Sequence, residues 1–207
     1  DDTGAASLGG DWFLESHTGV NLKTVYFTEL IEEYRGILYV FPYNIREYST
    51  KGFATGSVQA WGYYGGTTPG NVSSGVIAVY STRQAFAALK TDGSVVAWGS
   101  AATGGTTPGT VSSGVVAVYS AYYAFAALKT DGSVIAWGYS DWGGATPETV
   151  SSGVIAVYST EQAFAALKTD GSVVAWGESN YGGTTPGNVS SGVVAVYYNS
   201  LAFAALK

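Results

Sequence analysis

The stretch that decides the fold is residues 151–177, SSGVIAVYSTEQAFAALKTDGSVVAWG. It holds three short apolar runs, VIAVYS (154–159), AFAALK (163–168) and SVVAWG (172–177), which are rich in Val, Tyr, Trp and Phe. Runs of this length and composition, bounded by Gly, Asp and Ser, are typical of β-strands and too short for helices. Asp170-Gly171, between the second and third run, is a pair favoured in two-residue type I′ hairpins, where both central residues have positive φ. The stretch therefore predicts a small three-stranded antiparallel sheet.

The same unit recurs along the chain with a period of 39 residues, and nearly four copies fill residues 57–207. The leucine of the central run marks the period at Leu89, Leu128, Leu167 and Leu206. A three-stranded unit cannot bury both of its faces alone, whereas stacked copies form a continuous core. Repeats of about 40 residues with several strands are usual for propeller blades. A β-solenoid is the alternative, although its coils are generally shorter and lack such a hairpin.

The first 56 residues follow the repeat poorly. We expect strands at 10–16, 21–29 and 36–44 and a contracted copy of the repeat at 47–62, so that residues 1–56 form a degenerate first blade or an N-terminal cap. With the four copies in residues 57–207 this gives a single all-β domain, a propeller of about five blades. The fourth copy stops at Lys207, before its third strand. A strand at 11–15 would complete it and close the ring, or the open edge would pair with another copy of the chain.

The recurring order GGTTP, VSSGVVAV, ALKTDGSVVAWG resembles the short repeats of the regulator of chromosome condensation family. Within that family it is most similar to the propeller-type β-lactamase inhibitory proteins of bacteria. The resemblance covers residues 57–207 and implies a propeller fold. One departure is clear, because family repeats commonly carry Ala-Gly-x-x-His-Ser before the leucine strand, where this chain has Tyr-Ser-x-x-x-Ala-Phe.

Two loops differ between copies that are otherwise nearly identical. One follows Tyr-Ser at the end of the first strand, and the other follows Ala-Trp-Gly at the end of the third. Because three antiparallel strands run up, down and up, both loops emerge at one end of each unit and the Asp-Gly turns at the other. The residues expected on this variable rim are Tyr64, Arg83, Tyr122, Tyr123, Asp141, Trp142, Glu161, Asn180 and Tyr181. Aromatic residues with a few charges are the usual components of binding hot spots.

The resemblance points to the same rim, since the inhibitory proteins hold their target enzyme with aromatic residues from these loop positions. Unconstrained drift of free loops is the competing explanation. By contrast, Trp98, Trp137 and Trp176 occupy one unvarying position within the third strand, which predicts a packing role rather than ligand stacking.

The composition argues against several classes of function. Charged residues make up only 12% of the chain, there are no Cys, and the net charge is −6 with no Lys/Arg cluster, so nucleic-acid binding is disfavoured. The single histidine, His17, has no marked catalytic partner, and the repeated Asp92, Asp131 and Asp170 are explained by their turns. We expect no enzyme activity, no cofactor, no metal and no membrane span.

Asn71-Val72-Ser73 and Asn188-Val189-Ser190 match the N-glycosylation sequon, which makes Asn71 and Asn188 candidate glycosylation sites. Together with a start at Asp1 that resembles a product of signal-peptide removal, they favour an extracellular or cell-surface location.

The sequence thus predicts a non-catalytic protein-binding propeller, for example a secreted inhibitor or an adhesive module. The alternative is a structural repeat protein that self-assembles into extracellular fibres or a surface layer. A propeller lectin ranks last, because carbohydrate-binding residues would be repeated in every unit, whereas these loops differ.

Overall fold

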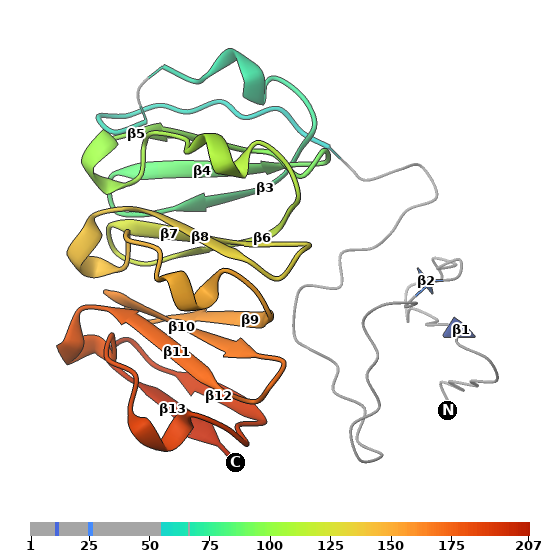
Figure 1. The fold of residues 1–207 in the computed structure, drawn as a ribbon. Coiled ribbons are helices and arrows are strands. Elements are labelled where there is room, and N and C mark those ends of the chain that lie inside the picture. Colours follow the sequence, from blue (N-terminus) through green and yellow to red (C-terminus); the bar gives the residue numbers. More distant parts are fainter. Residues whose placement is uncertain (1–10, 13–24, 27–54, 66) are drawn as a thin grey trace, which may run out of the picture. The chain divides into compact units, whose positions relative to one another are not determined.

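The computed structural model describes residues 11–12, 25–26, 55–65 and 67–207, and its sheets are all antiparallel (Figure 1). The chain divides into two compact units, residues 1–54 and 55–207. In the first unit β1 (Asp11–Trp12) pairs with β2 (Val25–Tyr26). The other strands predicted for the first 54 residues, His17 and the remainder of the predicted closing strand 11–15 lie outside the described residues.

The second unit consists of repeated antiparallel sheets. The first contains β3 (Val76–Ser81), β4 (Ala85–Lys90) and β5 (Val95–Gly99), in that order. The corresponding strands of the next two sheets are β6 (Val115–Ser120), β7 (Ala124–Lys129), β8 (Val134–Gly138), β9 (Val154–Ser159), β10 (Ala163–Lys168) and β11 (Val173–Gly177). A fourth sheet has two strands, β12 (Ala195–Tyr198) and β13 (Phe203–Leu206). The predicted order of three short strands is confirmed in the first three sheets, where AFAALK is the central strand, and in the fourth sheet FAAL is a strand.

The Asp-Gly hairpins differ from the predicted type I′ turn. The Gly93 N–H donates to the Lys90 carbonyl at 3.0 Å, and the Lys90 N–H donates to the Ser94 carbonyl at 2.9 Å. The central residues of the turn are therefore Thr91 and Asp92, and Gly93 follows them with φ 73°. This is a three-residue loop in which one left-handed glycine corrects the strand direction, so only the glycine needs positive φ.

Short 3₁₀ turns connect the sheets. The variable stretch after the third strand forms η2 (Ala101–Thr103), η4 (Ser140–Trp142) and η6 (Ser179–Tyr181). Each Thr-Pro dipeptide is followed by a second turn: η1 (Gly70–Val72), η3 (Gly109–Val111), η5 (Glu148–Val150) and η7 (Gly187–Val189). The proline precedes the turn at φ between −62° and −76°, as its ring requires, and the last valine of the turn is buried.

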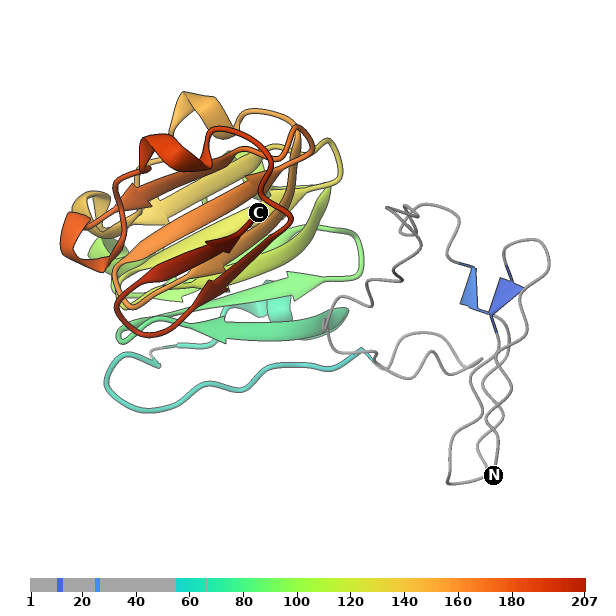
Figure 2. The same cartoon turned by 90° about the horizontal axis from the view of Figure 1, so that it is seen from below.

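The core lies between consecutive sheets, which are stacked one after another (Figures 1 and 2). Ala87 and Leu89 of one sheet pack against Val118, Phe125 and other apolar residues of the next. The same layer repeats between the second and third sheets and between the third and fourth. Each unit thus buries its faces only by contacting its neighbours, as expected for a repeat protein.

The strand tryptophans are packing residues, as predicted. Trp98, Trp137 and Trp176 are buried and stack on Phe86, Phe125 and Phe164 at ring-centroid distances of 5.4, 5.2 and 5.5 Å. The indole N–H groups of Trp137 and Trp176 each donate at 3.0 Å to a glycine carbonyl, of Gly104 and Gly143 respectively. Trp98 Nε1 has no such partner within residues 55–65 and 67–207.

The predicted count of about five blades and the predicted ring closure are not confirmed. Within residues 55–65 and 67–207 there are three three-stranded sheets and one two-stranded sheet. The described part of the strand predicted to close the ring, β1, pairs with β2.

Candidate functional site

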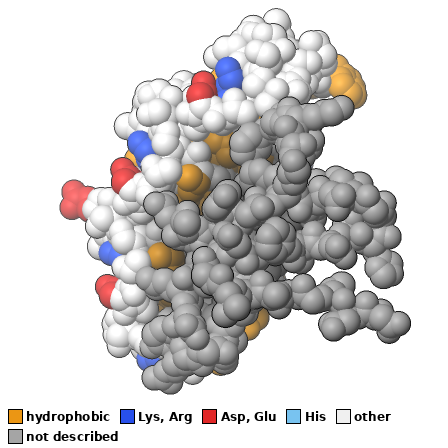
Figure 3. Space-filling model, turned by 90° about the vertical axis from the view of Figure 1, so that its right-hand side faces the viewer, with side chains coloured by type: hydrophobic (Ala, Val, Ile, Leu, Met, Phe, Trp, Pro, Cys, Tyr) orange, Lys and Arg blue, Asp and Glu red, His pale blue; other side chains and the backbone are white. Residues whose placement is uncertain are grey.

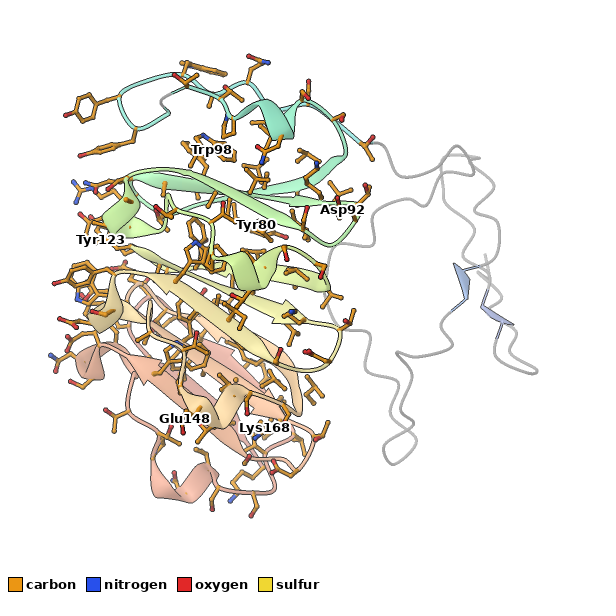
Figure 4. The ribbon with its side chains drawn as sticks, turned by 45° about the horizontal axis from the view of Figure 1, so that its top comes forward. Tyr80, Asp92, Trp98, Tyr123, Glu148 and Lys168 are labelled. Carbon is orange, nitrogen blue, oxygen red and sulfur yellow. The ribbon has the colours of Figure 1, made fainter. Side chains whose placement is uncertain are left out.

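The two variable loops of each unit meet at one end of the sheets. The Thr82 hydroxyl, in the loop after β3, donates to the Thr103 carbonyl, in the loop after β5, at 3.2 Å. The equivalent bond from the Thr160 hydroxyl to the Tyr181 carbonyl is 2.9 Å long. Figure 4 shows the result, with Tyr123 at this end and Asp92, from an Asp-Gly turn, at the other. The predicted geometry of the variable rim is therefore present in the fold.

Backbone hydrogen bonds join the rim loops of neighbouring units into one line. The Arg83 N–H donates to the Tyr122 carbonyl at 3.0 Å, and the Tyr122 N–H donates to the Glu161 carbonyl at 2.6 Å. The Glu161 N–H continues the line to the Ser200 carbonyl at 3.0 Å. These residues differ in side chain, yet their main chains occupy the same place in each unit. The rim is thus a fixed platform that carries variable side chains.

An open groove of about 590 Å³ runs along this line. Three of the predicted rim residues, Arg83, Tyr122 and Glu161, contribute to its lining. The other lining residues are Ser81, Thr82, Ser120, Ala121, Ser159, Thr160, Tyr198, Asn199 and Ser200. Most of this second set stands in the loop predicted to vary after the first strand. Comparison of the copies does not point to Ser81, Ser120 and Ser159, because this position is the same in three of the four copies and is Tyr198 in the fourth. Their repetition at the end of the first strand was the available signal.

Arg83 lies over the Tyr122 ring, with its guanidinium carbon 5.3 Å from the ring centroid, and also donates to the Tyr122 hydroxyl. Tyr122 continues into an aromatic cluster with Tyr123, at 4.8 Å, and Trp142, at 5.9 Å. The Tyr123 and Trp142 rings are nearly parallel, at 3° and 5.0 Å. The two variable loops of the β6–β8 sheet, which follow β6 and β8, therefore contribute to one aromatic surface beside the groove.

Four predicted rim residues stand apart from the groove. Asp141 accepts a bond from the Ser140 hydroxyl at 3.0 Å, and Asn180 bonds to the Glu178 carboxylate at 3.2 Å, so both have local structural partners. Tyr64 packs edge-on against Tyr63 at 4.8 Å. Tyr181 is half-buried, and its described role is to accept the Thr160 bond.

The opposite end carries the repeated acids. Asp92 Oδ1 accepts bonds from the Ser94 hydroxyl at 2.6 Å and from the Ser94 N–H at 2.9 Å. These bonds, the hydroxyl first, hold the pKa of Asp92 below its usual 3.8, and Asp131 and Asp170 are lowered for the same reason. Figure 3, which faces this side of the molecule, shows acidic and basic side chains recurring along it. The turn role predicted for the aspartates is confirmed.

Asn71 and Asn188 are both exposed, within η1 and η7, so the backbone leaves the two sequons accessible. In the described part of the chain, no three His, Cys, Asp or Glu side chains gather as a metal site would require. None of its helices is long and apolar enough to cross a membrane.

No protein-family model matches the sequence, and no curated protein does. Among solved structures, the chain is similar to Prp20p from Saccharomyces cerevisiae, a protein characterised for binding Gsp1p and histones, with 21% identity, a TM-score of 0.42 and coverage of 51% of this chain and 31% of that one. It is also similar to the CRINKLY WD40 ectodomain of the Arabidopsis thaliana receptor kinase ACR4, at 18% identity, TM-score 0.40 and coverage of 58% and 42%. For human WBSCR16 the values are 26%, 0.36, 56% and 36%. The chain spans less than half the length of each of these.

Proposed function

We propose that this chain is a non-catalytic binding domain of the propeller type, which captures a protein partner in the rim groove. The observation that carries the proposal is the line of variable residues Arg83, Tyr122 and Glu161, held side by side by backbone bonds and open to the groove. A rigid backbone that presents different side chains at equivalent places is suited to specific recognition, because little ordering entropy is lost on binding.

The chemistry of the groove favours a polypeptide ligand. Arg83 lies at one side of Tyr122 and Glu161 at the other, so the lining offers a positive group, an aromatic ring and a negative group in sequence. Serine hydroxyls from each unit lie along it and supply donors and acceptors for a main chain. We expect a segment with an acidic residue near Arg83, an apolar residue over Tyr122 and a basic residue near Glu161.

The proposal has three further parts. The domain is a propeller of about five blades, its repeats are of the regulator of chromosome condensation type, and the protein acts as a secreted inhibitor or adhesive module. The resemblance of residues 57–207 to repeats of that family supports the family type and the binding role, and the count of about five blades comes from the repeats in the sequence. An extracellular or cell-surface location, with sugars on Asn71 and Asn188, is proposed from the sequons and their exposure.

The test is selection of binders from a displayed library of random peptides, followed by affinity measurement. Changing Arg83, Tyr122 and Glu161 to Ala together should weaken the selected peptides by at least about tenfold, since central aromatic and Arg contacts dominate binding. The matched control changes Thr91, Thr130 and Thr169 to Ala at the opposite end, where all three are exposed. Both variants should keep the melting temperature of the unmodified chain.

Equal affinity for both variants would refute the rim assignment. Peptides that respond only to the control would place the binding surface at the Asp-Gly turns instead.

A further inference from the structure

The aromatic surface beside the groove continues past Trp142 to a further ring. The centroid of the Tyr139 ring lies 5.5 Å from that of the Trp142 ring, and the ring planes meet at 72°, so the two rings form a corner. Tyr139 is 43% exposed, and much of its ring is therefore open to a ligand. Trp142 also contacts the rings of Tyr122 and Tyr123, which hold it in place. The corner is thus preformed on a supported ring.

The fold does not require a tyrosine at this position. Tyr139 precedes the 3₁₀ turn η4, and its counterparts in the loops of the first and third sheets are Ser100 and Glu178. The Glu178 carboxylate caps its turn by accepting a bond from the Asn180 N–H at 3.3 Å, whereas the Tyr139 side chain forms no cap. An exposed ring that extends an aromatic cluster without capping a turn or filling a core indicates contact with another molecule.

A carboxylate with an unpaired charge belongs to the same short turn. Asp141 is exposed and directly precedes Trp142 in η4. Its Oδ1 accepts a bond from the neutral Ser140 hydroxyl at 3.0 Å, which leaves the negative charge of the carboxylate unbalanced. Among the described residues, no Lys or Arg forms an ion pair with Asp141. The corner therefore combines two aromatic rings with a negative charge and is complementary to a cation.

The rim itself holds one cation on a ring of the same cluster. The Arg83 guanidinium carbon lies 5.3 Å from the centroid of the Tyr122 ring, and the guanidinium donates to the Tyr122 hydroxyl. The negative face of an aromatic ring attracts a cation in this way. Because Arg83 is engaged by Tyr122, the rings of Tyr139 and Trp142 are left for a cation from another molecule.

Among the cations of proteins, arginine fits this corner better than lysine. The guanidinium is planar and stacks on aromatic faces, and its fork of N–H donors matches the two oxygens of a carboxylate. It can therefore use the rings and the Asp141 carboxylate at the same time. The lysine ammonium is a compact, strongly hydrated point charge that does not stack.

We propose that Tyr139, Asp141 and Trp142 form a subsite for an arginine side chain of the protein partner. The guanidinium stacks in the corner between the two rings and donates to the Asp141 carboxylate. The net charge of −6 on the chain favours the approach of such a cationic partner. This subsite rests on the proposed function, since the arginine belongs to the partner that the groove captures.

Titration with Nα-acetylarginine amide tests the subsite separately from the groove. Added to the full chain, this probe should shift the NMR signals of the Trp142 indole N–H and the Asp141 amide in a saturable way. Nα-acetylcitrulline amide has the same planar shape without the charge, and it should bind at least about threefold more weakly. Nα-acetyllysine amide should also bind more weakly than the arginine probe, because its ammonium does not stack.

The repeats themselves supply substitutions that the fold accepts. Tyr139→Ser and Asp141→Ala each introduce the residue that the loop after β5 has at the same place, Ser100 and Ala102. Each should weaken binding of the arginine probe at least about threefold and leave the melting temperature unchanged. Glu148→Gln is the control matched for charge, since Glu148 is an exposed acid in η5, and it should leave the affinity unchanged.

Peptides selected from a displayed library supply the second readout. Selection on the unmodified chain should enrich arginine over lysine, and selection on a chain with both Tyr139→Ser and Asp141→Ala should not.

Equal binding of the arginine and citrulline probes, or unchanged affinity in either variant, would overturn the arginine subsite. Binding of a methyl glycoside in place of the arginine probe would show a carbohydrate site and would also contradict it. Peptide capture that depends on Arg83, Tyr122 and Glu161 would persist in these cases, so failure of the subsite can be told apart from failure of the proposed function.

Discussion

At the scale of single residues, one glycine in each variable loop is fixed by a single aromatic ring. Gly104, Gly143 and Gly182 have φ of 101°, 95° and 88°. A Cβ at these positions would lie 2.7, 2.6 and 2.7 Å from a ring carbon of Phe125, Phe164 and Phe203, respectively. No L side chain fits there without displacing the ring. The residues around these positions therefore differ between the loops, whereas the glycine itself is constant.

We predict that Gly143→Ala lowers the free energy of unfolding by about 1 to 3 kcal/mol, because it adds backbone strain and overpacks the buried Phe164. Urea denaturation followed by fluorescence measures the change. Gly109→Ala is the control, since a Cβ there meets nothing within 4 Å. Equal losses for the two variants would contradict this explanation.

The repeated Asp-Ser pairs predict a pH dependence. Because bonding from Ser94, Ser133 and Ser172 lowers the aspartate pKa values below 3.8, the bonds stabilise the fold above that pH. Their contribution is lost as the pH falls through the lowered pKa values. Changing the three serines to Ala should therefore reduce the melting temperature at pH 7, and the difference from the unmodified chain should shrink below pH 3.8. A difference that is constant with pH would rule out the linkage.

At the scale of the element, a threonine closes the outer edge of every third strand. The Ala97, Ala136 and Ala175 N–H groups donate to the hydroxyls of Thr107, Thr146 and Thr185 at 2.6 to 2.7 Å. The third strand would otherwise be a bare edge that could pair with other chains. The TTP motif thus both closes a strand and, through its proline, begins the next turn.

We expect Thr107→Val to cost about 1 to 2 kcal/mol of stability, because it leaves the buried Ala97 N–H without an acceptor. Thr106→Val is the matched control, since Thr106 is the exposed neighbour. Thermal unfolding of both variants measures the effect. A larger loss for the Thr106 substitution would be inconsistent with edge closure by Thr107.

The elements that could be predicted from the sequence are those with a repeated local signal. AFAALK is predicted to be a strand because its neighbours are β-branched and aromatic, and the alternating direction of three antiparallel strands then predicts both variable loops at one end. The turn type was not predictable from Asp-Gly alone, because the Lys90 and Ser94 bonds decide which residues are central. Ser81, Ser120 and Ser159 are not found by comparing the copies, because a groove residue that is the same in three of four copies cannot be told from a structural one in the sequence.

At the scale of the whole stack of sheets, residues 55–207, each sheet makes the same contacts with the next one. Apolar residues of neighbouring sheets are buried against one another in each layer. The stack also fixes the rim, since Arg83, Tyr122 and Glu161 are joined only through bonds between units. The position of the rim residues is therefore a consequence of the repeated packing between neighbouring sheets.

Amide hydrogen exchange tests this arrangement most directly. The N–H groups of Arg83, Tyr122 and Glu161 lie in loops that would exchange freely in an isolated unit, but each is bonded to the next unit. We predict that they exchange at least about tenfold more slowly than unbonded loop amides such as that of Ala145. Exchange at the rate of an unstructured chain would show that the units do not stack with their variable loops in line.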